Sequence, residues 1–186
     1  MADPDRCPIC GAARPADAPE GLCPRCLMRN ALGGDAGEPS GEVTAAAYRE
    51  FFVGTEWADY LDAIADIAGR AERTEILVAT DDDRIIGSAT LELDGRTSPE
   101  DGPLEPHQAH IRMLGIHPDA RGRGAAKALM AACEARARVA GRTVLTLNTS
   151  ERMAAAKAMY ERLGYGRRDD EVMPDGFVLL SYGKQL

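Results

Sequence analysis

Residues 111–130 read IRMLGIHPDARGRGAAKALM, and this segment carries most of the information about the fold. It predicts a short apolar strand, a Pro-Asp turn, a loop rich in Gly and Arg, and a helix rich in Ala and Leu. Because Gly122 and Gly124 lack side chains, the loop backbone can approach a ligand closely and align its N–H groups. The helix that follows adds N–H donors and the positive end of its dipole. The segment therefore suits a diphosphate, with Arg121 and Arg123 adding charge at the rim.

Helices and strands alternate on both sides of this segment. Helices are predicted over residues 44–52, 56–73, about 125–140 and 151–163, and strands over 75–80, 84–93, 108–116, 143–148, 165–168 and 176–182. This order predicts an α/β domain with a mixed, twisted sheet that is covered on both faces. Gly115 interrupts the strand before the loop, where we expect a bulge or a close approach of another backbone.

In the loop, Arg121, Gly124 and Ala126 have the spacing R-x-x-G-x-A. This resembles the acetyl-CoA-binding motif of the GNAT superfamily of N-acyltransferases, Q/R-x-x-G-x-G/A at a strand-to-helix turn, and the resemblance extends from about Thr44 to the C-terminus. It implies a fold in which two central strands splay apart around the pantetheine arm, here the strands ending at Ile116 and at residue 148. The first strand of the family is expected to be missing or replaced, because a linker ends just before the first helix.

The resemblance also implies which residues bind the donor. The backbone of one strand would pair with pantetheine, the N–H of Leu114 would polarise the thioester carbonyl, and the loop would hold the diphosphate. The residues concerned are Met113, Leu114, Gly115, Ile116, Arg121, Gly122, Arg123, Gly124, Ala125 and Ala126. From their sequence alone, Met113, Leu114 and Ile116 also fit an ordinary core strand, and a backbone role is compatible with both interpretations.

Asn148 ends a strand, and the helix after it contains AMYERLGY with Tyr160. This segment resembles the second GNAT motif, which implies that Asn148 orients cofactor or substrate and that Tyr160 protonates the departing thiolate as general acid. A phenol with a pKa near ~10 is a sensible donor to a thiolate of pKa near ~8.5. The simpler interpretation of Tyr160 is a core position on an amphipathic helix.

Two residues are candidates for the general base. Alternation along 108–114 places His110, Arg112 and Leu114 on one face of the strand, and Met113 on the other. Many relatives use a Glu in this strand as base, and His110 stands near that place. A histidine with a pKa near ~6.5 can accept a proton at neutral pH. Glu92 on the adjacent strand is an equal candidate, and an acceptor amine of low pKa needs no base.

Composition limits the class of protein. The net charge of −8 argues against nucleic-acid binding, which depends on Lys and Arg, and fits a cationic amine better. An apolar content of 45% supports a core, and no stretch has the length of a membrane span or the design of a signal peptide. We therefore expect a cytoplasmic protein.

Four cysteines near the N-terminus form two CxxC pairs, Cys7 with Cys10 and Cys23 with Cys26. Four thiolates at this spacing can hold one tetrahedral Zn²⁺ in a structural site, with disulfides as the competing interpretation. The segment resembles a zinc ribbon. We expect three parts: a ribbon-like module over 1–30 that packs on the domain or contacts a protein partner, a flexible linker over 31–42, and the acetyltransferase domain over 43–186.

These features predict an acetyl-CoA-dependent N-acetyltransferase in which a small-molecule or protein amine attacks the thioester directly. The alternative is a non-catalytic CoA-sensing or protein-interaction module, which the expected loss of the first strand favours. The superfamily also suggests a homodimer in which the last strand pairs with a second copy.

Overall fold

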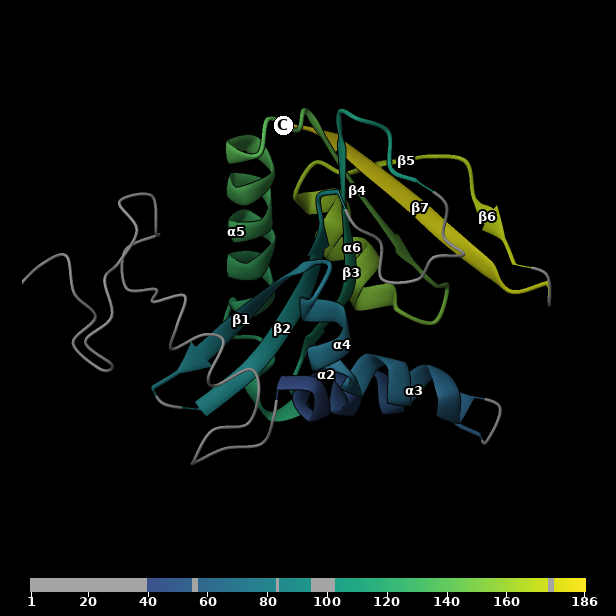
Figure 1. Cartoon of the computed structure of the whole chain (residues 1–186). Helices are drawn as coiled ribbons and strands as arrows, with labels where there is room; N and C mark the ends of the chain where they lie inside the picture. Colours follow the sequence, from purple (N-terminus) through teal and green to yellow (C-terminus); the bar gives the residue numbers. More distant parts are fainter. Residues whose placement is uncertain (1–39, 55–56, 83, 95–102, 174–175) are drawn as a thin grey trace, which may run out of the picture.

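Figure 1 shows the computed structural model of the protein, which describes residues 40–54, 57–82, 84–94, 103–173 and 176–186. The helices are α2 (Ser40–Arg49), α3 (Ala58–Ala65), α4 (Ile67–Ala71), the 3-10 turn η3 (Pro118–Ala120), α5 (Ala125–Val139) and α6 (Ala154–Arg162). The strands are β1 (Glu75–Asp81), β2 (Arg84–Glu92), β3 (Gln108–Ile116), β4 (Val144–Thr149), β5 (Gly166–Arg167), β6 (Glu171–Val172) and β7 (Val178–Gln185). The expected mixed α/β order is confirmed.

One twisted sheet organises the molecule, with strand order β1-β2-β3-β4-β7-β5 and β6 paired to β7. All neighbouring pairs are antiparallel except β3 and β4, which are parallel. The strand β2 is buried from Ile85 to Glu92, as expected for a strand covered on both faces. Because β7 pairs with β4 on one edge and with β5 and β6 on the other, it offers little free edge to a second copy. This topology gives no support to the expected homodimer.

The central parallel strands separate part of the way along their length. β3 and β4 pair only where Gln108–Ile111 face Val144–Leu147. Beyond these residues β3 continues to Ile116 and β4 to Thr149 without pairing to each other. The two splayed strands expected from the sequence are therefore present, and a gap in the ladder opens at their carboxyl ends.

A β-bulge lies on β3 at the start of this gap. Thr90 pairs with Arg112 and Ser88 with Gly115, so two residues, Met113 and Leu114, stand opposite one residue of β2. Met113 has a positive φ of 50°. The extra residue reverses the alternation of side chains. Met113 therefore packs on the α2 side of the sheet and Leu114 against the core on the α5 side, and the predicted faces of these two residues are wrong.

Two apolar clusters cover the two faces of the sheet. On one face, α5 and α6 pack on the sheet, with Leu129, Met130, Cys133 and Ala137 of α5 buried at helical spacing. On the other face, α2 packs on β2 and β3, and α3 packs on α2. A Cβ at Gly115 would lie 3.0 Å from Thr44 Cγ2, so this glycine permits the close approach of α2 that the sequence suggested.

The N-terminal predictions lie largely outside the described residues. The proposed zinc ribbon, with Cys7, Cys10, Cys23 and Cys26, falls in residues 1–39, as does the place of the family's first strand. The described part of the chain begins with α2, and β1 is an edge strand of the sheet that the described residues form. α2 begins at Ser40, whereas the sequence suggested a helix from Thr44, and both residues are buried. The described residues contain no helix that is long and apolar enough to span a membrane.

Candidate active site

The loop between β3 and α5 has the geometry expected of an anion-binding turn. Gly122 and Gly124 have φ values of 78° and 87°, a region that other residues rarely adopt. Gly124 is the N-cap of α5, and the first intrahelical bond runs from the Ala128 N–H to the Gly124 carbonyl. The N–H groups at the start of α5 therefore have no carbonyl of their own helix to bind, and the 15-residue helix directs its positive end there.

The two arginines of the loop are held by acidic partners. Arg121 lies 2.5 Å from Glu50 and donates to the carbonyl of Ala47, which joins the loop to α2. Arg123 lies 2.6 Å from Asp81 at the end of β1. All four charged side chains are substantially exposed. Exposed ion pairs contribute at most about 1 kcal/mol, so these guanidinium groups can exchange a carboxylate for a phosphate at little cost.

A cavity of about 400 Å³ lies on the α2 side of the sheet, between β3, β4 and the aromatic side chains of the early helices. It is lined by Tyr48, Phe52, Trp57, Tyr60, His110, Ile111, Arg112, Met113, Asn148, Thr149, Ser150, Met153, Glu171, Met173, Phe177 and Leu179. Residues from the bulge and from the end of β4 take part, so the cavity reaches the gap between the splayed strands. It joins two predicted site residues, His110 and Asn148, to part of the predicted donor strand.

Five of the nine aromatic residues of the chain line this cavity, and none of them stands out as a site residue in the sequence. Neighbouring rings of this aromatic wall have centroids 4.8–6.4 Å apart. The wall is made of Tyr48, Phe52, Trp57, Tyr60 and Phe177. Tyr48 lies in α2, Tyr60 in α3, and Phe52 and Trp57 in the segment between these helices, where apolar residues indicate only packing. The fold, by bringing Phe177 from the other end of the chain, turns these residues into the wall of a cavity.

His110 lies on the cavity, and its ring is oriented by a hydrogen-bond chain. Its Nδ1 is 2.8 Å from Thr146 Oγ1, and that hydroxyl donates to the carbonyl of Ala109 over 3.1 Å. A hydroxyl has one proton, so this arrangement makes Nδ1 the donor to Thr146. A neutral His110 then carries its lone pair on Nε2, the nitrogen that accepts a proton in base catalysis.

Glu92, the other candidate base, is directly opposite His110 in the β2–β3 ladder. Its side chain is fully buried and is absent from the cavity lining. A general base must come within hydrogen-bond reach of the proton that it removes. The geometry therefore favours His110 over Glu92 as the residue that can touch an acceptor in this cavity.

Tyr160 lies on α6, on the opposite side of the sheet from the aromatic wall. Its ring is buried in the core beside Tyr165 and Tyr182, with ring centroids 6.2 and 6.0 Å away. Burial, with a smaller contribution from Cys133, raises the pKa of Tyr160 well above its ordinary value. The phenol therefore keeps its proton throughout the physiological range. It is not among the residues that line the cavity.

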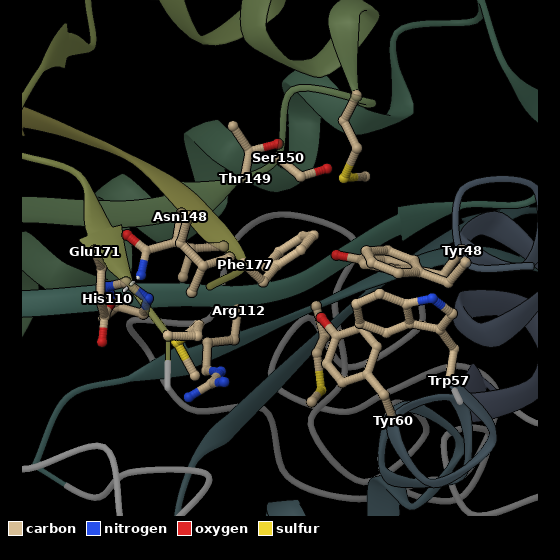
Figure 2. A pocket seen from close by; sticks show the side chains of 16 residues that line it. Tyr48, Trp57, Tyr60, His110, Arg112, Asn148, Thr149, Ser150, Glu171 and Phe177 are labelled. Atoms are coloured by element: carbon tan, nitrogen blue, oxygen red, sulfur yellow. Dashed lines mark hydrogen bonds between the residues drawn. The ribbon is translucent and has the colours of Figure 1, made fainter. Parts of the chain in front are cut away.

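Asn148 is held at the end of β4 by both ends of its amide. Its Nδ2 donates to Glu171 over 3.1 Å (Figure 2). Its Oδ1 accepts from Ser181 Oγ over 2.9 Å. These bonds come from β6 and β7, so they fix the amide at the cavity wall. A fixed polar group at this place is suited to orienting a ligand, and the role of Asn148 stays a prediction.

Metal and thiol chemistry find little support in the described part of the chain. No group of three or more His, Cys, Asp or Glu side chains there is placed to hold a metal ion. Cys133 is buried, and burial raises the pKa of its thiol to about 12. Such a thiol is protonated and a poor nucleophile.

Comparison with known proteins gives a consistent result. The sequence model of the acetyltransferase (GNAT) family matches residues 42–165. A GCN5-related N-acetyltransferase from Rhodopseudomonas palustris is 22% identical, with a TM-score of 0.60 over 86% of this chain and 91% of that one. The protein yncA from Salmonella typhimurium, solved with its cofactor acetyl-CoA, is 18% identical, with a TM-score of 0.53 over 78% and 86%. At these identities the structures establish a shared fold.

Proposed function

Because the chain belongs to the acetyltransferase (GNAT) family, we propose that it transfers the acetyl group of acetyl-CoA to a primary amine, which attacks the thioester directly. The observation that carries this proposal is the gap between β3 and β4. At this gap the ladder ends, the loop leading to α5 begins on one strand, and the cavity adjoins both strands. A donor held by the loop and passing through the gap would present its thioester to an amine in the cavity.

The donor would be held mainly by backbone groups. The loop from Arg121 to Ala126 offers N–H groups at the N-terminus of α5 to the diphosphate. The bulge at Met113 and Leu114 frees one residue of β3 from the regular ladder. We propose that the Leu114 N–H thereby donates to the thioester carbonyl oxygen and stabilises the negative charge that develops there. Gly115 and Ile116 would continue the backbone pairing with the pantetheine arm.

Two side chains would move the protons of the reaction. His110 would take a proton from the attacking amine through Nε2, because its Nδ1 is occupied by Thr146. Tyr160 would give its proton to the departing thiolate from the α6 side of the gap, and Asn148 would orient the ligand between them. Placing acid and base on opposite faces of the sheet fits a donor that passes through it.

Replacing His110 by Gln tests the base. We expect kcat/KM for the amine to fall by about 10²-fold near neutral pH, with acetyl-CoA affinity unchanged, since a positioned base contributes about 10²–10⁴-fold. Steady-state kinetics with calorimetry measure both quantities. Glu92→Gln is the matched variant, and we expect a smaller loss from it. A larger fall in kcat/KM in Glu92→Gln than in His110→Gln would contradict this assignment and indicate that Glu92 is the base.

The proposed function is tested by measuring release of the CoA thiol from acetyl-CoA with a panel of primary amines. We expect release that requires both the enzyme and an amine. A folded protein that binds acetyl-CoA and releases no thiol with any amine would be a non-catalytic CoA-binding module instead.

We also propose that Cys7, Cys10, Cys23 and Cys26 bind one structural Zn²⁺ through four thiolates, an arrangement that leaves no position for catalysis. Purified protein should contain about one zinc per chain, measured by mass spectrometry of the metal. Replacing Cys7 and Cys10 by Ser should remove most of the zinc. Because these residues precede the domain, acetyl-CoA binding should persist in the variant. Intact disulfides with no bound zinc would contradict this assignment.

A further inference from the structure

Two buried hydroxyl groups lie on the cavity at the end of β4. Thr149 and Ser150 are 5% and 3% exposed, and within the described residues neither side-chain oxygen has a hydrogen-bond partner. Both residues line the cavity (Figure 2). An unpaired buried polar group destabilises a protein, and native structures contain few of them. These hydroxyls are therefore suited to binding a polar group of a molecule inside the cavity.

The hydroxyls lie where the central strands have separated. β3 and β4 pair no further than Ile111 and Leu147, and β4 ends two residues later at Thr149. A thioester that emerges from this gap must have the attacking nitrogen about 3–3.5 Å from its carbonyl carbon. A primary amine carries N–H donors, and a hydroxyl oxygen can accept them. Thr149 and Ser150 are thus suited to holding the nitrogen of the acceptor.

The aromatic wall also reaches this gap. Burial raises the pKa of Tyr48 well above its ordinary value, with smaller contributions from Tyr60 and from Tyr160. Tyr160 belongs to the core on the α6 side of the sheet, so this interaction between Tyr48 and Tyr160 crosses the sheet. An amine held at the gap would therefore have the aromatic wall beside it.

The wall determines what the rest of the acceptor can be. Its rings contact one another and line a cavity of about 400 Å³, a size typical of sites for small molecules. Covering such a surface with an apolar group removes apolar area of both molecules from water, which favours binding. A short, strongly hydrated amine would leave the wall uncovered. The cavity accordingly favours an acceptor with a large apolar group.

The charged groups at the cavity are matched in sign and already have partners. Arg112 and Glu171 both line it; Arg112 has an interaction partner, and Glu171 accepts from Asn148. The fully buried Glu92 is opposite His110 in the ladder, on the same face of the sheet, and it too has a partner. A second charged group on the acceptor would lose its water without gaining an unoccupied counter-charge among these residues. An acceptor with no ionisable group besides its amine fits best.

We infer that the acceptor is a primary amine with a large, uncharged apolar group, such as an arylalkylamine: the hydroxyls of Thr149 and Ser150 hold its nitrogen, and the aromatic wall binds its apolar group. This inference rests on the proposed function, because it names the substrate class of that same cavity. In the reaction, the nitrogen–acyl bond forms, the carbon–sulfur bond of the thioester breaks, and the amine proton leaves for His110 while the thiolate gains one from Tyr160.

The test compares phenethylamine with ethylamine, which lacks the phenyl ring, and with phenylalanine, which adds a carboxylate. All kcat/KM values are expressed for the unprotonated amine. We expect kcat/KM for phenethylamine to exceed that for ethylamine at least about 30-fold, which corresponds to about 2 kcal/mol. It should exceed that for phenylalanine at least about tenfold. Equal or better use of either comparison compound by the unaltered enzyme would overturn the inference and leave the proposed function intact.

Trp57→Leu tests the aromatic wall. The Trp57 ring contacts those of Phe52, Tyr60 and Phe177. Its loss should reduce the preference for phenethylamine over ethylamine at least about threefold. Phe51→Leu is the matched control and should keep the preference, because Phe51 packs on the same cluster but is not among the residues that line the cavity. An unchanged preference in Trp57→Leu would contradict the assignment of the apolar group to this wall.

A variant that combines Thr149→Val with Ser150→Ala tests the hydroxyls. Within the described residues these groups have no hydrogen-bond partner, so the thermal midpoint should stay unchanged or rise. We expect KM for phenethylamine to rise about fivefold or more, with the dissociation constant of acetyl-CoA unchanged. Thr74→Val is the control. Its hydroxyl donates to the Arg70 carbonyl over 2.8 Å, so its loss should lower the midpoint and leave KM unchanged.

Two results with the combined variant would contradict the inference. A lower midpoint with unchanged KM would assign the hydroxyls to stability. Weaker binding of acetyl-CoA with unchanged KM for the amine would assign them to the donor.

Binding without turnover distinguishes the inference from the proposed function. If none of these amines is acetylated, the proposed function fails for this acceptor class. A thermal shift with phenethylamine, and none with ethylamine, would then still support the inferred ligand. A shift with neither compound would overturn it.

Discussion

Tyr160→Phe should lower kcat by about 10²–10³-fold and leave the dissociation constant of acetyl-CoA unchanged. The hydroxyl is the single group removed, and a general acid contributes about 10²–10⁴-fold to proton transfer. Because burial raises the pKa of Tyr160, the phenol stays protonated as the pH rises, and the ratio of the two kcat values should be constant from about pH 6 to pH 9. Kinetics over this range, with calorimetry of both proteins, measure the effect.

Tyr165→Phe is the matched control. Tyr165 is also a buried tyrosine of the same core, but its hydroxyl donates to Glu134 over 3.2 Å. Its loss should reduce stability by about 1 kcal/mol with a small effect on kcat. Equal activity of Tyr160→Phe and the unaltered protein would remove Tyr160 from the mechanism.

Gly124→Val should weaken acetyl-CoA binding by about 100-fold, which corresponds to about 2.7 kcal/mol. A β-branched residue does not tolerate the φ of 87° at this position, so the loop would rotate its N–H groups away from the diphosphate. A Cβ on Gly124 would meet no atom within 4 Å, so the expected loss comes from the backbone conformation and not from a clash within the protein. Calorimetric titration with acetyl-CoA measures the loss.

Gly141→Val controls for backbone strain. Gly141 follows the other end of α5 and has a similar φ of 73°, and a Cβ added there would likewise meet no atom within 4 Å. Its replacement should cost about 1–3 kcal/mol of stability and leave acetyl-CoA binding unchanged. If both variants bind acetyl-CoA as tightly as the unaltered protein does, the loop does not bind the diphosphate.

Local signals explain why the segment around the glycine loop could be predicted. The glycines at positions 122 and 124 predict positive φ values in the loop. The buried face of α5 is predicted by the helical spacing of Leu129, Met130, Cys133 and Ala137. These properties depend on residues that are neighbours in the sequence. The geometry of the loop between β3 and α5 follows from them.

The bulge on β3 has no such signal. Met113 adopts a φ of 50° because of its place in the sheet. A positive φ is uncommon for methionine, so the sequence does not predict it. Strict alternation therefore gave Met113 and Leu114 the wrong faces. Helix α6 likewise starts at Ala154 and not at Glu151, because residues 151 and 152 form a turn, and its N-cap Met153 makes no side-chain capping bond that would mark this start in the sequence.

The cavity is a product of long-range assembly. Its aromatic wall combines α2, α3, the segment between them and the residue that precedes β7. Its polar side combines β3 with the end of β4. Each segment taken alone fits an ordinary core element. The hydroxyls of Thr149 and Ser150 are notable because, within the described residues, they lie buried without a partner, a property of the folded chain and not of its sequence.

The most direct test of the account is to follow isotopically labelled acetyl groups from acetyl-CoA by mass spectrometry. We predict that the amine gains one labelled acetyl group for each CoA thiol released, and that the mass of the enzyme stays unchanged when the amine is withheld. This agrees with the buried, protonated Cys133 thiol, which is not suited to forming an acyl-enzyme. Label that accumulates on the enzyme, or thiol release without a labelled amine, would contradict direct transfer between the two substrates.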